Sequence, residues 1–465
     1  MKQTELPNIV LVVMDTVGAK RCSLYGHHRP TTPGLERLAA DGVLYRYCFA
    51  PAAWTVPSHV SLFSGLYPGQ HGCNTQNFDY PGNFYVLPEI LQQAGYRTAA
   101  ISSNYLVSRS CNFQYGFDEF HEMDLLFNTD RFYNMRRNIK AAADSYKNDV
   151  EEIIFIIKSS FKSNYYSYPL AHLLDRVYRQ LWGDLINKSS HATERSIRIA
   201  KKLIRNWQKR PFFLFINFME AHQKYNPPKG YNNLLKRRQP GDDISELLYD
   251  QEIAYLDHRL LEFYTFLEKQ GLKDQTLFIV TSDHGEAFGE HGFWGHIKSL
   301  HNEMTHIPLL VKYPASYGLQ GEDDRLVQLH DLFATLLEAA GAPVPAPESS
   351  WSLLGPGRDF ALLENFDPSF AFPKLAQKRP QDPPPVPSTG IIDAQLLKLI
   401  QWGDGRRELY DLQGDFGETA NLVDHPDYQG KLAQLQARLE ELSPPPWKPG
   451  PEPPQGPPGD GRLRL

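Results

Sequence analysis

Three short runs of hydrophobic residues predict strands that are buried on both faces. They cover residues 8–14, 211–219 and 277–282, and β-branched or aromatic side chains make up most of each run. Uninterrupted runs of this length are typical of the parallel sheet of an α/β protein, which helices cover on both sides. In such sheets ligands bind beyond the carboxyl ends of the strands. We therefore expect the residues that follow these runs to lie at one edge of a sheet.

Acidic residues and histidines follow all three runs. Asp15 follows the first run, His222 lies shortly after the second, and the pair Asp283 and His284 follows the third. An acid after a single strand is usually a turn residue or a helix cap. Acids and histidines after three strands of one sheet favour a shared site instead.

The segment Trp54–Gly65 predicts a short helix that carries a hydroxyl at its start. Thr55 lies near the expected N-cap, Pro57 falls in the first turn, and Gly65 ends the helix. Free backbone N–H groups and the positive end of the helix dipole suit a bound anion there. The Thr55 hydroxyl, with His59 one turn further on, could attack a phosphate or sulfate ester. A threonine that only caps the helix is the alternative interpretation.

The whole pattern predicts an α/β fold with a large, mostly parallel sheet flanked by helices and a smaller C-terminal α+β subdomain. Residues 329–340 have an amphipathic helical pattern, residues 395–402 and 406–412 alternate as in a β-hairpin, and residues 427–442 favour a closing helix. These features indicate where the chain divides.

The predicted boundaries follow shifts in composition. The main domain covers residues 1–345 and includes a helical insertion at about 125–210. The C-terminal subdomain covers residues 346–442. Residues 443–465 are rich in proline and glycine, so we expect a disordered tail there.

Composition favours an enzyme with a large hydrophobic core, and the pattern of the N-terminus favours a cytoplasmic protein. Hydrophobic residues make up 41% of the 465 residues, and the net charge of −6 gives no reason to expect nucleic acid as a partner. The N-terminus lacks the pattern of a signal peptide, and the longest apolar stretch of the helical region, residues 153–157, is too short for a membrane segment. The four cysteines are then expected to be reduced and buried. The oligomeric state stays open.

Motifs in a fixed order from Asp15 to Leu422 resemble those of the sulfatase family, within the alkaline phosphatase superfamily. The matching blocks are residues 25–35, 55–59, 64–72, 219–222, 283–296, 408–412 and 418–422. The resemblance implies a metal-dependent hydrolase with the fold of that superfamily. It also implies a small-molecule substrate, or an ester on a glycan or a lipid headgroup.

Departures from the family pattern change the expected chemistry. Thr55 stands where sulfatases place the Cys or Ser that is oxidised to formylglycine. Because threonine carries a methyl group on that carbon, the same oxidation would give a ketone, so we expect no formylglycine. His59 stands where an arginine is usual, and the family's Lys-x-His pair is missing from the segment that leads to Asn104. A threonine nucleophile resembles the phosphoryl-handling branches of the superfamily.

The predicted ligands of one divalent metal ion are Asp15, Asp283 and His284, together with the Thr55 oxygen. Two carboxylates, an imidazole and an alkoxide suit Mn²⁺, Mg²⁺ or Ca²⁺, and Zn²⁺ is also compatible. Thr16 stands where sulfatases often have a second acid. The loss of that oxygen donor disfavours Ca²⁺.

The other predicted site residues act on the substrate. His222 is the candidate that protonates the leaving group, because a strand end fixes its position. His296 stands where the family usually has a lysine that contacts the sulfate, and Lys298 competes for that role. His222 and His296 join Thr55 and His59 as predicted catalytic residues, and Lys298 and Asn104 are predicted to bind substrate.

The sequence therefore predicts hydrolysis of phosphate or phosphonate esters through Thr55. The alternatives are a sulfuric ester hydrolase that uses the unmodified threonine, a transferase that passes the phosphoryl group to an alcohol, and a catalytically inactive binding module. The complete ligand set argues against an inactive module, since a site that drifts should lose ligands first.

Overall fold

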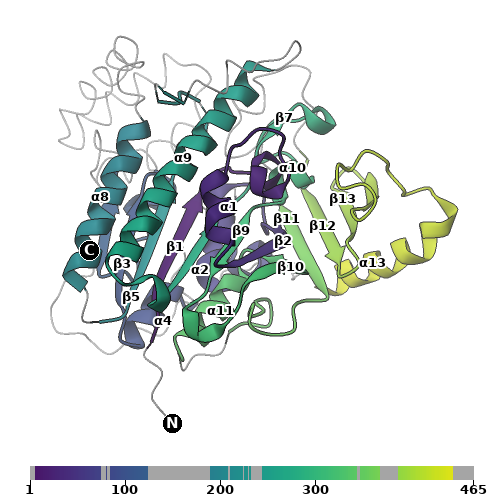
Figure 1. Ribbon diagram of the computed structural model, residues 1–465. Coiled ribbons are helices and arrows are strands. Elements are labelled where there is room, and N and C mark those ends of the chain that lie inside the picture. The colour runs from purple at the N-terminus through teal and green to yellow at the C-terminus, as the bar shows by residue number, and fades with distance from the viewer. Residues whose placement is uncertain are drawn as a thin grey trace, which may run out of the picture.

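The computed structural model contains a large sheet flanked by helices and a small C-terminal sheet (Figure 1). It describes residues 6–74, 80, 84–123, 189–207, 210–223, 225–228, 230–231, 243–342, 346–366 and 386–442. The large sheet has eight strands in the order β10-β2-β9-β6-β1-β5-β3-β4, and the small sheet has four in the order β11-β12-β13-β14.

The three hydrophobic runs form the three strands at the middle of the large sheet. Strand β1 (Asn8–Met14) pairs in parallel with β5 (Phe212–Phe218) on one side and with β6 (Thr276–Thr281) on the other. Met14 pairs with Phe218, so the residues that follow these strands start at the same edge. The prediction of parallel strands that are buried on both faces and end at one edge of the sheet is confirmed, and the structure adds that the three strands are neighbours.

The other strands of the large sheet complete a mostly parallel arrangement. They are β2 (Val43–Phe49), β3 (Arg97–Ser102), β4 (Glu119–Glu122), β9 (Leu309–Lys312) and β10 (Gly321–Gln328). Strand β9 runs antiparallel to both of its neighbours, β2 and β6, and the remaining pairs are parallel. The predicted fold class is confirmed.

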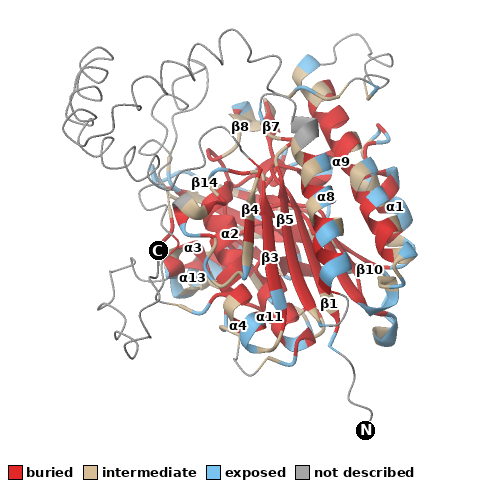
Figure 2. Ribbon diagram, turned by 90° about the vertical axis from the view of Figure 1, so that its left-hand side faces the viewer, coloured by how far each residue is buried: buried red, intermediate tan, exposed pale blue. Residues whose placement is uncertain are grey.

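Helices pack on both faces of this sheet. One face carries α1 (Pro33–Ala39), α8 (Ser189–Trp207) and α9 (Ile244–Lys269), and the other carries α2 (Thr55–Ser64), α4 (Leu87–Gln93) and α11 (Asp331–Ala339). Figure 2 shows the buried strands between these two layers. Side chains of β1 alternate between the two cores, with Ile9 and Leu11 on the α2 side and Val10 and Val12 on the α9 side. Of the predicted helical insertion, residues 124–188 lie outside the described residues, and α8 follows them.

The C-terminal subdomain consists of an antiparallel sheet and a closing helix. Its elements are β11 (Phe360–Asn365), β12 (Ser388–Asp393), β13 (Leu397–Trp402), β14 (Arg407–Asp411) and α13 (Gln429–Leu442). Strands β13 and β14 form the predicted hairpin, and Leu432, Leu435 and Leu439 of α13 pack on the sheet. The predicted tail, residues 443–465, lies outside the described residues.

Short elements fill the connections. They are α3 (Pro68–His71), β7 (Ala287–Phe288), β8 (Trp294–Gly295), α10 (Asn302–Thr305) and the 3-10 helices Ala19–Arg21, Ser23–Tyr25, Arg109–Cys111, Lys273–Gln275, Glu290–Gly292, Ala315–Tyr317 and Pro426–Tyr428. Within the described part of the chain, none of the helices combines the length and the apolar character that crossing a bilayer requires.

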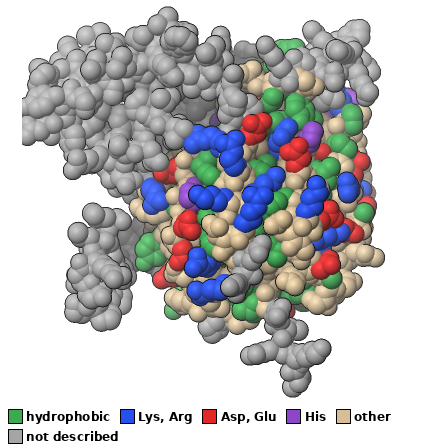
Figure 3. Space-filling view, turned by 60° about the vertical axis from the view of Figure 1, so that its left-hand side comes forward, with side chains coloured by type: hydrophobic (Ala, Val, Ile, Leu, Met, Phe, Trp, Pro, Cys, Tyr) green, Lys and Arg blue, Asp and Glu red, His purple; other side chains and the backbone are tan. Residues whose placement is uncertain are grey.

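Basic side chains gather on the surface of α8 that faces away from the sheet. They are Arg195, Arg198, Lys201, Lys202 and Arg205. Figure 3 shows Lys and Arg side chains gathered on this side of the molecule. Lys201 and Arg205 lie over the ring of Phe266 of α9, at 5.5 and 5.1 Å from its centroid. We call this surface the basic face of α8, and it is cationic although the whole chain is anionic.

Candidate functional site

Thr55 lies at the start of α2 with its hydroxyl directed at a histidine. The helix runs from Thr55 to Ser64, and Gly65 ends it in the left-handed conformation, as the sequence predicts for its end. Trp54 takes the N-cap position without a side-chain hydrogen bond, so Thr55 is the first helical residue rather than the cap. Its Oγ1 atom lies 3.4 Å from Nε2 of His284. The buried hydroxyl therefore points toward His284 and is not used as the helix cap.

Asp15, Asp283 and His284 form a cluster that fits a divalent cation. All three side chains are fully buried, and one ligand atom from each lies within 4.8 Å of the others. Oδ1 of Asp15 and Oδ2 of Asp283 have no hydrogen-bond partner. Two buried carboxylates, each with an unpartnered oxygen, are costly unless a cation balances them. The predicted ligand set therefore fits a metal ion on the structure's own geometry.

The remaining contacts of this cluster orient its ligand atoms. Oδ1 of Asp283 accepts hydrogen bonds from the backbone N–H groups of Thr16 and His284, at 3.1 and 3.0 Å. Nδ1 of His284 donates to the carbonyl of Gly285 at 2.9 Å, which leaves Nε2 as the lone-pair nitrogen. Burial raises the pKa of Asp283, with the Asp15 charge adding to it, and burial lowers the pKa of His284 well below its usual value. A neutral imidazole is the form that binds a metal.

Asp15 is held by two amide side chains. Its Oδ2 atom accepts a hydrogen bond of 2.6 Å from Nδ2 of Asn104 and a longer one of 3.4 Å from Nδ2 of Asn217. Asn104 thus contacts a predicted metal ligand. Asn217 was not among the predicted site residues, although a polar residue inside the hydrophobic run of β5 was a signal for it.

His59 lies behind the ligands rather than beside the Thr55 hydroxyl. Its Nδ1 atom donates to the backbone carbonyl of Thr55 at 2.9 Å and lies 3.5 Å from Oδ2 of Asp283. Since a carbonyl only accepts, the proton is on Nδ1, and Nε2 accepts from Nδ2 of Asn217 at 3.3 Å. Burial lowers the pKa of His59. These contacts describe a neutral histidine that fixes the first turn of α2.

His222 and His296 lie close together at the same edge of the sheet. The ring of His296 lies 4.7 Å from the ring of His284 and 5.1 Å from that of His222, centroid to centroid. Nδ1 of His222 donates to the carbonyl of Gln223 at 3.0 Å. Nδ1 of His296 lies 3.3 Å from Oε2 of the buried Glu286.

The pKa of His296 is raised above its usual value. Burial acts to lower it, while the charge and hydrogen bond of Glu286, together with the charge of Asp15, act to raise it. Glu286 belongs to a motif that the sequence singled out, yet it was not predicted as a site residue. The signal was its place in the same loop as Asp283 and His284.

Strained backbone places His296 and Lys298 in the site. Ile297 has a φ of 82°, which is an outlier for a β-branched residue, and its N–H donates to the carbonyl of Ala53 at 2.9 Å. Lys298 is buried, and its charge acts on His296. Thr16, next to Asp15, is a second β-branched residue with positive φ, at 62°. Strain of this kind concentrates at sites where surrounding contacts over-determine the backbone.

Comparison with protein families gives one match that covers most of the chain. The family model described as Sulfatase matches residues 7–342. A similar curated protein is the N-acetylglucosamine-6-O-sulfatase of Bacteroides thetaiotaomicron, which is 24% identical over 499 aligned residues that cover 95% of this chain and 87% of that protein.

Solved structures with the same fold include a protein named as a phosphonate hydrolase and a protein bound to a sulfated sugar. The phosphonate monoester hydrolase of Agrobacterium radiobacter matches with a TM-score of 0.64 and 19% identity, over 93% of this chain and 96% of its own. A protein solved in complex with its substrate D-glucosamine-2-N,6-O-disulfate matches with a TM-score of 0.62 and 17% identity, over 94% of this chain and 97% of its own. Both proteins share the fold of this chain.

Proposed function

The chain belongs to the sulfatase family, and we propose that it hydrolyses phosphate or phosphonate esters with the Thr55 hydroxyl as nucleophile. The family and its relatives make it a hydrolase of ester bonds. The observation that carries the finer proposal is the position of Thr55 Oγ1, at the start of α2 and 3.4 Å from Nε2 of His284.

A divalent ion would be held by Asp15, Asp283 and His284, with the Thr55 oxygen beside them. Mn²⁺, Mg²⁺, Ca²⁺ and Zn²⁺ are compatible with these donors. When bound, the ion would lower the pKa of the Thr55 hydroxyl and offset negative charge on the ester.

The side chains around Thr55 account for both steps of a double displacement. In the first step the Thr55 hydroxyl gives up its proton to solvent, the bond from its Oγ to phosphorus forms while the bond from phosphorus to the leaving oxygen breaks, and His222 donates the proton that this oxygen takes up. In the second step water attacks the phosphothreonine and gives up a proton to His222. The bond from phosphorus to Oγ breaks, and the Thr55 oxygen takes a proton back from solvent. Each cycle therefore consumes one ester and one water and restores Thr55.

Positive charge is available for the non-bridging oxygens of the ester. His296, whose pKa Glu286 raises, and Lys298 lie on the same strained segment. Charges fixed in a buried site stabilise developing negative charge without reorganisation. His59 and Asn104 take positioning roles in this proposal, since His59 contacts the backbone of Thr55 and Asn104 contacts Asp15.

The methyl group of Thr55 favours phosphorus over sulfur. A sulfatase that uses formylglycine releases sulfate when a hydrated aldehyde collapses, and threonine cannot give that aldehyde. A sulfated threonine would need a second attack at sulfur. Phosphoryl transfer through a covalent phosphothreonine needs only positioning and charge stabilisation at each step.

A sulfate ester on an anionic glycan is the second candidate. The similarity to an N-acetylglucosamine-6-O-sulfatase favours it, and the basic face of α8 offers positive charge to an anionic polymer. A transferase would give the same phosphothreonine and pass the group to an alcohol. The product identifies it, because the acceptor ester then appears in place of free phosphate.

A panel of esters of one chromophore tests these possibilities. The substrates are a phosphate monoester, a phosphate diester, a phosphonate monoester and a sulfate ester, each assayed with and without added alcohol acceptor. We expect the phosphorus esters to be turned over best, Thr55→Ala to abolish turnover, and Thr55→Ser to keep part of it. Thr265→Ala on α9 is the matched control and should retain full activity. A clear preference for the sulfate ester, or activity in Thr55→Ala, would overturn the proposal.

A further inference from the structure

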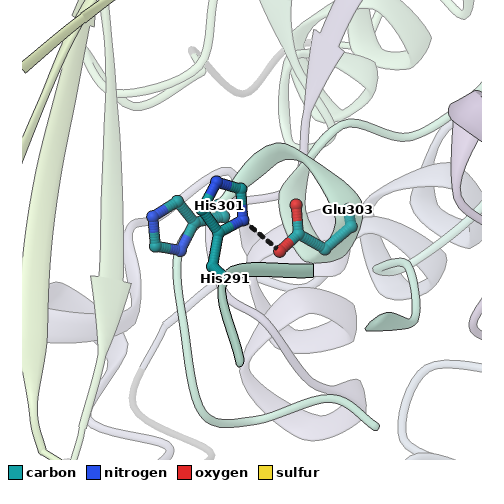
Figure 4. Close-up of side chains that lie close together, drawn as sticks. All are labelled: His291, His301 and Glu303. Carbon is teal, nitrogen blue, oxygen red and sulfur yellow. Dashed lines mark hydrogen bonds and ion pairs between the residues drawn. The ribbon is translucent and has the colours of Figure 1, made fainter. Parts of the chain in front are cut away.

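A second group of histidines and carboxylates lies where the main domain meets the C-terminal sheet. We call it the His291 cluster: His291, His301, Glu303, Glu408 and Glu418. His291 follows β7, His301 and Glu303 lie at the start of α10, Glu408 lies on β14, and Glu418 follows β14. Figure 4 shows the first three side chains together. Neither histidine belongs to the ester site.

The contacts of His291 require two protons on its ring. Nε2 lies 2.9 Å from the backbone carbonyl of Glu418, which can only accept, and Nδ1 lies 2.9 Å from Oε1 of Glu303. Beside an ionised carboxylate, Nδ1 must donate as well. His291 is therefore an imidazolium that bridges the main domain and the C-terminal subdomain.

His301 has contacts that suit the neutral form. Nε2 lies 2.9 Å from Oε2 of Glu408, and Nδ1 contacts the hydroxyl of Ser299, which can donate to it. The rings of His291 and His301 stack in parallel, with centroids 3.8 Å apart and planes 5° apart. Because only His291 carries a charge, the stacked pair avoids the repulsion that two cations would have at this distance.

This geometry holds a proton rather than a metal ion. Three of the four ring nitrogens make hydrogen bonds, and the fourth, Nε2 of His301, lies at an ion-pair distance of 2.9 Å from Oε2 of Glu408. In addition, the lone pairs of parallel stacked rings lie in parallel planes and do not converge on one point. A cation would have to displace several of these contacts.

The segment between the two histidines carries the groups that face the ester. His296 and Lys298 lie between His291 and His301 in the chain, so the stacked rings bring the two ends of that segment together. The C-terminal subdomain anchors the same point, because Oε2 of Glu418 accepts the N–H of Asn302 at 2.6 Å and its Oε1 pairs with the buried Lys398 at 2.7 Å.

We propose that protonated His291 is a positioning residue, which clasps the segment carrying His296 and Lys298 onto the C-terminal subdomain and so sets their place at the ester. The proposal rests on the proposed function for the roles of His296 and Lys298. A neutral His291 keeps one hydrogen, which stays on Nδ1 beside the Glu303 carboxylate because a carboxylate is the stronger acceptor. Nε2 then faces the Glu418 carbonyl without a hydrogen, so the contact with the C-terminal subdomain is lost as the pH rises.

The surrounding charges set the pH at which this happens. The groups that face His291 are Glu303 of α10, the Glu418 and Asp415 residues after β14, Tyr410 of β14 and the stacked His301. Burial acts to lower the pKa of His291, but the charges of Glu303 and Glu418 raise it to about 9. The clasp is therefore closed at neutral pH and opens as the pH rises through about 9.

Variants of His291 and Glu303 test the clasp by two independent measurements. The first is calorimetric titration of the metal-loaded protein with inorganic phosphate from neutral to alkaline pH, which needs no turnover. The second is kcat and KM on whichever ester of the panel is best. We expect His291→Gln to weaken phosphate binding and lower kcat/KM about tenfold at neutral pH. In this variant we also expect phosphate binding and kcat/KM to lose their dependence on pH near 9.

Glu303→Gln should shift the pH at which phosphate binding and kcat/KM fall. A purely structural role of His291 would not give such a shift. The variant keeps the shape of the side chain and removes one charge beside His291, so the alkaline fall should move to lower pH by about one unit. His425→Gln, at an exposed histidine of the same subdomain, is the control and should match the wild type. An unshifted alkaline fall in Glu303→Gln, or wild-type phosphate binding in His291→Gln, would overturn the clasp. Failure of every phosphorus ester with these binding shifts intact would overturn the proposed function alone.

Discussion

Nδ2 of Asn217 donates a hydrogen bond to Nε2 of His59 across 3.3 Å, inside the core and out of reach of solvent. The same amide lies 3.4 Å from Oδ2 of Asp15. A single residue of β5 thus connects the first turn of α2, where Thr55 lies, with a predicted metal ligand at the end of β1. Through this side chain, β5 links the proposed nucleophile to the proposed metal site.

Replacement of Asn217 by Leu is expected to lower both stability and activity. The change leaves Nε2 of His59 without a donor, and a buried polar group without a partner costs roughly 1–3 kcal/mol. Thermal unfolding measures the loss, and kcat should fall because Asp15 and the turn at Thr55 lose their connection. Asn365→Leu is the matched control, because both amide atoms of that buried residue already lack partners. Asn365→Leu should leave stability unchanged or raise it. If the two variants change stability and kcat alike, Asn217 does not have this connecting role.

Hydrophobic pattern was sufficient to predict the sheet and the convergence of Asp15, Asp283 and His284. Strands β1, β5 and β6 are buried on both faces, so their runs are uninterrupted, and parallel pairing brings their ends together. The family motifs then supplied the order of the blocks.

Other features of the site depend on contacts between residues far apart in the chain. Asn217 acts through Asp15 and His59, which no local pattern connects to it. The positive φ of Ile297 is imposed by its surroundings, since an isoleucine does not favour that conformation by itself. The stacking of His291 on His301 likewise requires the C-terminal sheet to be in place.

Asp283→Asn is expected to remove bound metal and activity together. The variant keeps an oxygen that can accept the N–H groups of Thr16 and His284, but it loses the charge that a divalent cation requires. Elemental analysis of the purified protein measures the metal. Asp257→Asn is the control for the loss of a buried carboxylate away from the site, and it should keep the bound metal. It is the harsher change for folding, because the two oxygens of Asp257 each accept a different backbone N–H, from Gly34 and Leu35. A full metal complement in Asp283→Asn would refute the ligand assignment.

Glu220→Gln is expected to stabilise the protein at alkaline pH. Burial raises the pKa of Glu220 to about 7, from an ordinary value of 4.5 in the unfolded chain. The folded protein holds this proton more tightly than the unfolded chain does, so the free energy of unfolding falls as the pH rises from 4.5 through about 7. Glutamine removes that loss and still accepts the N–H of Thr193.

The gain from Glu220→Gln should be on the order of 1–3 kcal/mol above neutral pH and should vanish in acid. Denaturant unfolding at both pH values measures it. Glu262→Gln, at an exposed position of α9, is the control and should change stability little at either pH. An equal effect of Glu220→Gln at acid and alkaline pH would contradict the titration of Glu220 as the cause.

Covalent trapping at Thr55 decides the reaction class. If His222 supplies the proton for the leaving group and later takes one from water, His222→Asn slows both steps. An ester with an acidic leaving alcohol needs little protonation, so with such a substrate the second step should limit turnover and the phosphothreonine should accumulate. Rapid acid quench followed by peptide mass spectrometry should then find a phosphate-sized adduct on the peptide that contains Thr55. The double variant with Thr55→Ala should give none. Turnover of phosphorus esters without any adduct would contradict a phosphothreonine intermediate. Faster formation of the Thr55 adduct from the matched sulfate ester would instead contradict the preference for phosphorus.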